Sequence, residues 1–243
     1  MYSPRNTSAF GRRGSRSQYQ FQAASSYDAK QASGLVSKVM GLLSFSFLFA
    51  TLGAFVGSAL LPLTLGGTWI LFIVGIIVLF ALQALIRKPG INLFLLYLFT
   101  FIEGMAIGPL LGLYFYAGLG SIVTEAFLIT TVTSLVLGLY AWVAKTDFSH
   151  MRDFLFVGLI LIIVASLINI IFASGILQLV ICVAGIGIFC GLILYDVQKA
   201  KYLANTLPNA IGLTVSLFLD VLNLFMFILE LLTILQGGGG RRR

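Results

Sequence analysis

The chain has 243 residues, of which 59% are hydrophobic and only 9% are charged, and its formal net charge is +7. A soluble domain carries roughly 25% charged residues because it needs a solvated surface. A chain this poor in charge cannot cover itself against water, so the composition excludes a soluble globular domain and predicts a protein whose solvent is lipid. The cations lie in the terminal segments and between apolar runs, which leaves no folded basic surface for a nucleic-acid partner.

Residues 1–32 are rich in Ser, Arg, Gln and Tyr and show no apolar periodicity. This composition predicts a flexible basic N-terminal arm. We do not expect a cleavable signal peptide, because the first apolar run starts near Val36 and is too long for the apolar core of one.

Seven apolar segments follow the arm, and each is long enough to span ~30 Å of hydrocarbon. Their approximate limits are 36–61, 68–86, 92–116, 122–144, 154–173, 176–197 and 210–235. The sequence therefore predicts an all-α fold, a polytopic membrane bundle of seven transmembrane helices formed by residues 33–236. A Gly/Arg tail, residues 237–243, closes the chain.

Lys and Arg residues fall on alternate connections between these segments. The arm and the loops at 87–91, 145–153 and 198–209 carry them, whereas the loops at 62–67, 117–121 and 173–175 carry none. This alternation predicts a cytoplasmic N-terminus. Seven spans would place the C-terminus outside, which Arg241 to Arg243 contradict unless the last segment is re-entrant or the short tail simply crosses. The side of the C-terminus therefore stays open. The short loops favour the inner (plasma) membrane of a bacterium, with the bilayer as the first partner.

Glycines four residues apart predict close helix packing, because two small residues on one face let neighbouring backbones approach. The pairs are Gly53 and Gly57, Gly108 and Gly112, and Gly187 and Gly191.

The sequence lacks the parts of several kinds of catalytic site. Cys182 and Cys190 lie eight residues apart in one apolar run, more than two helical turns, and cannot form a disulfide. The one histidine, His150, lies in a polar loop, so neither a Ser-His pair nor a zinc or haem site can be assembled. We therefore expect neither enzymatic activity nor a bound cofactor.

Carboxylates inside apolar spans are candidates for function, since a charge in hydrocarbon is costly. The five are Glu103, Glu125, Asp196, Asp220 and Glu230. Glu125 and Glu230 lie near the ends of their spans, where interfacial placement explains them. The other three have apolar neighbours and no Lys or Arg one turn away within their own spans, with Lys199 and Lys201 just beyond the sixth.

Asp196 and Asp220 belong to consecutive antiparallel segments joined by a short loop. Two carboxylates that share a dry site cannot both ionise cheaply, so they tend to share a proton. Such a pair is either a proton-sensitive latch or a site for a hard cation such as Ca²⁺, which prefers oxygen ligands.

Three stretches of the chain resemble signatures of the Bax inhibitor family, also called the transmembrane Bax inhibitor motif family. Residues 99–104 with Gly108 and Pro109 are similar to its third span, and residues 194–198 to its sixth-span "LYD" motif. Residues 216–225 are similar to its last-span signature, an aspartate followed by "xxNLF". The similarity runs from about residue 36 to 236 and favours a bacterial-type member.

The resemblance implies a seven-helix fold whose last helix is central, enclosed by the other six, and a pH-sensitive calcium leak as the function. In bacterial relatives an aspartate pair on the last two helices shares a proton and governs the pore, and this pattern carries over to Asp196 and Asp220. Relatives also use a second-span arginine as a latch on the first aspartate, and Arg87 is the nearby candidate. Glu103 matches an acidic position of many members.

We therefore expect a proton-gated leak with Ca²⁺ as the permeant ion and Asp220, Asn223 and Glu103 along its path. The alternative is an interaction protein that binds a membrane protease or stress or cell-death regulators without conducting ions, its aspartates only fixing helix register. A proton-coupled transporter is less favoured because no inverted repeat is evident. An intramembrane protease is less favoured because Tyr195 and Asp196 match only part of its motif.

Overall fold

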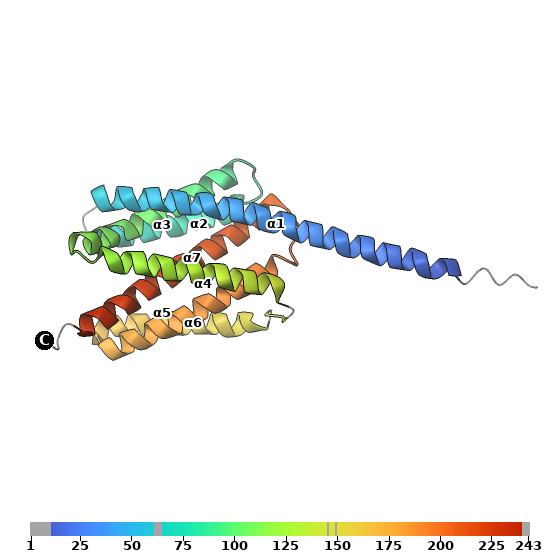
Figure 1. Cartoon of the computed structure of the whole chain (residues 1–243). Coiled ribbons are helices and arrows are strands. Elements are labelled where there is room, and N and C mark those ends of the chain that lie inside the picture. The colour runs from blue at the N-terminus through green and yellow to red at the C-terminus, as the bar shows by residue number, and fades with distance from the viewer. Residues whose placement is uncertain (1–10, 61–64, 145, 149, 240–243) are drawn as a thin grey trace, which may run out of the picture.

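Seven α-helices make up the part of the chain that the structure describes (Figure 1). The computed structural model describes the backbone of residues 11–60, 65–144, 146–148 and 150–239, and the side chains of residues 31–60, 70–144, 146–148 and 150–237. The helices are α1 (Gly11–Leu60), α2 (Leu65–Leu85), α3 (Ile91–Tyr116), α4 (Gly120–Val143), α5 (Met151–Phe172), α6 (Gly175–Lys199) and α7 (Leu207–Gly239). The predicted all-α bundle is confirmed.

The helices are apolar over most of their surface, as lipid requires. Six of them are long and apolar enough to cross a membrane within the described residues, and α2 adds a shorter apolar stretch, Ile70–Leu85. Large side chains face outward along the bundle, among them Phe55 and Phe154, each 74% exposed, and Ile171, 80% exposed. Helices satisfy their own backbone hydrogen bonds, so hydrocarbon can cover such a surface without leaving polar groups unpaired.

Helix α1 starts well before the membrane domain. Its backbone is helical from Gly11, and its first part projects beyond the bundle (Figure 1). The segment with the predicted flexible arm therefore has a helical backbone from residue 11 onward. A helical backbone does not test whether the arm moves, so the flexibility of the arm stays a prediction.

Glycines bring α1 and α3 into close contact. A Cβ atom at Gly53 would collide with the carbonyl of Phe101, and one at Gly104 with the carbonyl of Ala50. Gly57, Gly108 and Gly112 also face the neighbouring helix across this seam. The prediction of close packing holds for only one glycine of the sixth-span pair. Gly191 packs against a leucine of α5, whereas Gly187 is exposed and faces open space.

Helix α7 lies at the centre of the bundle. It packs against α1, α3, α4 and α6, and it contributes residues to each of the three buried hydrophobic clusters. Helix α5 is peripheral and packs closely only against α6 among the described helices. The central last helix is thus confirmed, although four helices rather than six make its close contacts. It is continuous over 33 residues, so the re-entrant alternative is wrong.

The cation-bearing connections gather at one end of the bundle. Lys201 donates from Nζ to the carbonyl of Ala144 at 3.2 Å, which joins the α6–α7 and α4–α5 connections. The backbone N–H of Asn205 donates to Oε1 of Gln31 at 3.2 Å, which brings the membrane-proximal part of α1 to the same place. Helix α7 then carries the chain to the opposite end (Figure 1). We call the end at which the Lys- and Arg-bearing connections meet the cationic end.

Candidate functional site

The structure brings Asp196 of α6 and Asp220 of α7 together inside the bundle. Both are buried, with 6% and 7% of their surface exposed. They are close enough for the charge of Asp196 to act directly on the carboxyl of Asp220. The site lies at the α6–α7 interface, the most extensive contact that α6 makes.

Two further side chains complete this site. The side chain of Ser216 lies close to the carboxyl of Asp196, and Ser216 lies one turn before Asp220 on α7. Asp196 therefore faces the turn of α7 that ends at Asp220. On its own helix, Asp196 has Oδ1 4.0 Å from Nζ of Lys199, whose side chain is 42% exposed.

Lys199 corrects the sequence-based boundary of the sixth span. The sequence predicted a span that ends at residue 197 and leaves Lys199 outside, whereas α6 continues to Lys199 itself. The spacing of three residues from Asp196 placed both on one helical face and was the available signal. A cation thus borders the pair on the side where the bundle meets water.

The two carboxyls are neighbours without being bonded to each other. Among the described residues no hydrogen bond joins them, and Oδ2 of Asp220 is buried without a hydrogen-bond partner. A buried acceptor left unpaired costs about 1–3 kcal/mol. A proton held between the two groups would satisfy it, and so would a cation.

The pair is a poor resident metal site. Calcium takes six to eight oxygen ligands. In the part of the chain that the structure describes, no group of three or more His, Cys, Asp or Glu side chains gathers in one place. Asp196, Asp220 and the hydroxyl of Ser216 supply only part of a calcium shell.

Glu103 lies apart from the aspartate pair. It is half-buried on α3, and its Oε1 would lie 2.8 Å from a Cβ atom built on Gly75 of α2. Its carboxylate therefore faces the α2–α3 seam. Asn223 lies on α7 within one turn of Asp220 and donates from its amide to the carbonyl of Leu219 at 2.8 Å.

Arg87 lies in the turn after α2, which ends at Leu85, and it is exposed. The ion pair found among the described residues involves Lys199 and Asp196, not Arg87. A latch between Arg87 and the pair is not formed in this conformation, and its role in another state stays a prediction.

A second polar cluster, missed in the sequence, lies at the end of the bundle opposite the cationic end. The amide of Asn169 on α5 donates to Oε1 of Gln178 on α6, and Nε2 of Gln178 donates to Oε1 of Glu230 on α7 at 2.6 Å. Glu230 is therefore bonded within the bundle, whereas the sequence predicted a merely interfacial place. A glutamine inside an apolar span was the overlooked signal. Glu125 is exposed, as interfacial placement predicts.

The fold and this site define a class: an α-helical integral membrane protein with a buried carboxylate pair on its last two helices. The family model described as "Inhibitor of apoptosis-promoting Bax1" matches residues 32–237. The chain belongs to this family, the Bax inhibitor family, and the resemblance found in the sequence is confirmed.

Relatives of the chain occur in bacteria and in a virus. A protein of Helicobacter pylori is 37% identical over 206 residues, which cover 83% of this chain and 88% of the relative. A protein of Campylobacter jejuni is 39% identical over 210 residues, or 84% and 90% of the two chains. The "Golgi anti-apoptotic protein" of vaccinia virus is 29% identical over 203 residues, or 81% and 84%.

Proposed function

We propose that this protein is a pH-sensitive cation leak channel with Ca²⁺ as its permeant ion, gated by Asp196 and Asp220. The observation that carries the proposal is the buried pair itself, two carboxyls facing each other across the α6–α7 interface with Lys199 at its edge. Buried ionisable groups in a membrane protein are costly to maintain and mark ion or proton pathways.

The pair gates the channel through its protonation state. With one proton between them, Asp196 and Asp220 attract each other and hold α7 against α6. When that proton leaves, two like charges meet in a medium of low dielectric constant and repel. Because α7 packs against four other helices, a shift of α7 alters the packing at the centre of the whole bundle.

Asp220 and Asn223 lie within one helical turn on α7 and would contact the ion one after the other. Glu103 would contact it elsewhere, on the α2–α3 side. Arg87 would act as a latch only if its turn moved toward the pair. The proposal involves no enzymatic step and no resident cofactor, and Ca²⁺ is cargo.

We place the protein in the inner membrane of a bacterium with its N-terminus in the cytoplasm. The gathering of cation-bearing connections at one end supports this orientation, because cytoplasmic loops are enriched in Lys and Arg. The relatives in Helicobacter pylori and Campylobacter jejuni support the bacterial membrane.

The test is Ca²⁺ flux into proteoliposomes over a pH series for the wild-type protein, Asp196→Asn and Asp220→Asn. The wild type should conduct more as pH rises and the pair loses its proton. An asparagine amide donates to the remaining carboxylate without needing that proton. Each variant should therefore keep the latch closed, with flux about tenfold lower at alkaline pH and little pH dependence.

Glu125→Gln is the matched control, since it removes an exposed carboxylate from α4 and leaves the pair untouched. It should conduct like the wild type. Variants that retain the wild-type pH profile would show that the pair is not the sensor. A folded wild-type protein that conducts no Ca²⁺ at any pH would exclude the channel itself.

The alternative function is that of an interaction protein. The observation that favours it is the similarity to the vaccinia relative, which is named as a Golgi anti-apoptotic protein. In this case the bundle would bind a membrane protease or a stress or cell-death regulator. Asp196→Asn and Asp220→Asn would then leave partner binding intact, with no flux to lose.

A further inference from the structure

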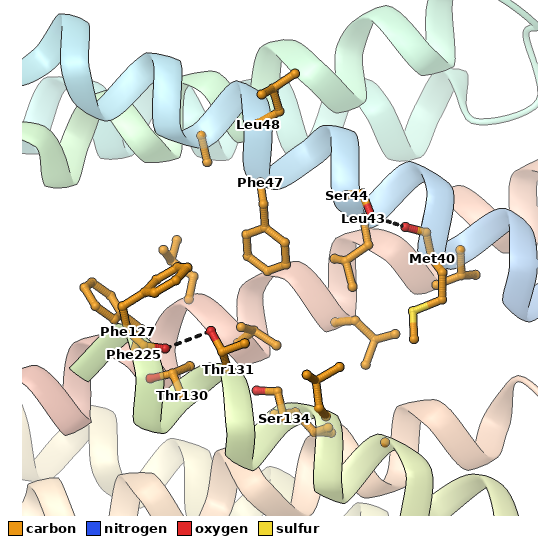
Figure 2. A pocket seen from close by; sticks show the side chains of 18 of the residues that line it. Met40, Leu43, Ser44, Phe47, Leu48, Phe127, Thr130, Thr131, Ser134 and Phe225 are labelled. Carbon is orange, nitrogen blue, oxygen red and sulfur yellow. Dashed lines mark hydrogen bonds between the residues drawn. The ribbon is translucent and has the colours of Figure 1, made fainter. Parts of the chain in front are cut away.

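A large apolar cleft lies between α1 and α4. It has a volume of about 1090 Å³, and residues of α7 form its floor. Figure 2 shows Phe47 and Met40 of α1 directed across it toward Thr131 and Ser134 of α4. The cleft exists because α1 and α4 are not among the closely packed helix pairs, although both pack on α7.

The cleft opens on the surface that faces the bilayer. Residues at its rim are exposed, including Leu139 at 68%, Phe127 at 61% and Leu48 at 53%. Its polar lining is largely satisfied locally, because Ser44 and Thr131 donate to carbonyls of their own helices. An apolar cleft of this kind does not attract water, and its walls lose dispersion contacts unless an apolar molecule fills it.

The shape of the cleft matches acyl chains. Its lining on α1 runs from Val36 to Ala54, which at ~1.5 Å per residue is about 27 Å along the helix. The hydrocarbon core of a bilayer is about 30 Å thick. The cleft is therefore a long groove that runs parallel to the helices and spans most of the membrane thickness.

One end of the cleft carries positive charge. Lys201 follows the lining residue Ala200 directly in the chain. Nζ of Lys201 also lies 5.8 Å from the ring centroid of Trp142, another lining residue. Tryptophan and lysine at the end of an apolar cleft are typical of the headgroup region of a bilayer.

We infer that this cleft binds an anionic phospholipid, with the headgroup phosphate at Lys201 and the acyl chains along α1 and α4. A lipid there completes the packing around α7 on the side that the other helices leave open. A lysine ammonium has three N–H donors. Lys201 uses one of them to bond the carbonyl of Ala144, and the other two are left for a phosphate. The inference is independent of the proposed channel activity.

The test uses Trp142 as the reporter. In a Trp69→Phe background it is the one tryptophan of the chain, and lipids brominated on their acyl chains quench it on contact. Brominated phosphatidylglycerol and brominated phosphatidylcholine are titrated into the full-length protein in detergent. The anionic lipid should quench at low mole fraction and saturate. Phosphatidylcholine should quench weakly and without saturation.

Charge and volume are then varied separately. A lysine near a membrane surface contributes about 1 kcal/mol toward anionic lipid, so Lys201→Gln should weaken phosphatidylglycerol binding about fivefold. Lys88→Gln, at an exposed lysine of the α2–α3 turn, should not. Gly138 lines the cleft, and a Cβ atom there meets no atom within 4 Å, so Gly138→Leu should fold and displace the acyl chain. Gly187→Leu, at an equally open glycine outside the cleft, is its control.

Equal, unsaturable quenching by both lipids would show ordinary annular contact and overturn the inference. So would unchanged quenching in Gly138→Leu. A second copy of the chain in the cleft would make the protein a dimer by light scattering and the quenching independent of added lipid, and this result would also overturn it.

Discussion

At the scale of single residues, the aspartate pair is defined by what surrounds it. Asp196 has Lys199 on its own helix and Ser216 on the next, while Asp220 has one buried oxygen without a hydrogen-bond partner. The two carboxyls are therefore not equivalent. Asp196 faces the only ion-paired cation among the described residues, and Asp220 faces mainly Asp196.

In the proposed channel, Lys199 should influence the pH at which the flux rises. A positive charge near two carboxyls favours their ionised form, so its removal lets the pair keep its proton to higher pH. In Lys199→Gln the rise of Ca²⁺ flux should move to higher pH, and the shift should be modest because the side chain is partly exposed and screened. Flux measured over a pH series at low and high salt checks this, with a smaller shift at high salt.

Lys88→Gln removes a lysine from the same end of the bundle, away from the pair, and should leave the flux profile in place. A midpoint that moves to lower pH in Lys199→Gln would contradict the electrostatic role assigned to this lysine.

At the scale of helices, two kinds of contact join the elements. Glycines let α1 and α3 approach until backbone meets backbone. Polar side chains tie α5, α6 and α7 together through Asn169, Gln178 and Glu230. Both substitute for the hydrophobic effect, which cannot drive helices together in a solvent as apolar as they are.

Substitution at the α1–α3 seam should be costly even with alanine. A Cβ atom at Gly104 collides with the backbone carbonyl of Ala50, and backbone cannot rotate out of the way as a side chain can. We expect Gly104→Ala to lower the free energy of unfolding by about 1–3 kcal/mol. Gly41→Ala is the control, because Gly41 on α1 faces open space. Thermal unfolding in detergent, followed by circular dichroism, checks both, and equal melting temperatures would show that the seam can relax.

At the scale of the whole molecule, the two ends of the bundle differ in chemistry. The connections that carry Lys and Arg lie at one end together with the membrane-proximal part of α1, and α7 carries the chain to the other. If all seven helices cross the membrane, the two termini lie on opposite sides of it.

This arrangement predicts opposite labelling of the two termini. In a background without Cys182 and Cys190, Ser17→Cys and Gly238→Cys are treated with a membrane-impermeant maleimide in intact cells. Gly238→Cys should react from outside, and Ser17→Cys only after the membrane is permeabilised. Equal reactivity of both would contradict the crossing of α7, and reversed reactivity would contradict the cytoplasmic N-terminus.

The sequence alone determined the class of the protein and most helix limits. Hydropathy is a property of each residue, so apolar segments can be counted without knowing what they touch. The predicted segments 92–116 and 122–144 lie within about two residues of α3 and α4. The family signatures singled out Asp196 and Asp220 in the same way, because they are local in the chain.

Only the tertiary structure decided which faces of these helices meet. A span that is apolar all round carries no stripe to mark its buried side, because lipid and protein neighbours select the same residue types. The sequence therefore could not show that Glu103 faces α2, that Glu230 bonds to Gln178, or that Gly187 faces open space while Gly191 is packed. The cleft between α1 and α4 has the same origin. It arises from two helices that both pack on α7 and leave space between them, and no segment of the sequence contains that relation by itself.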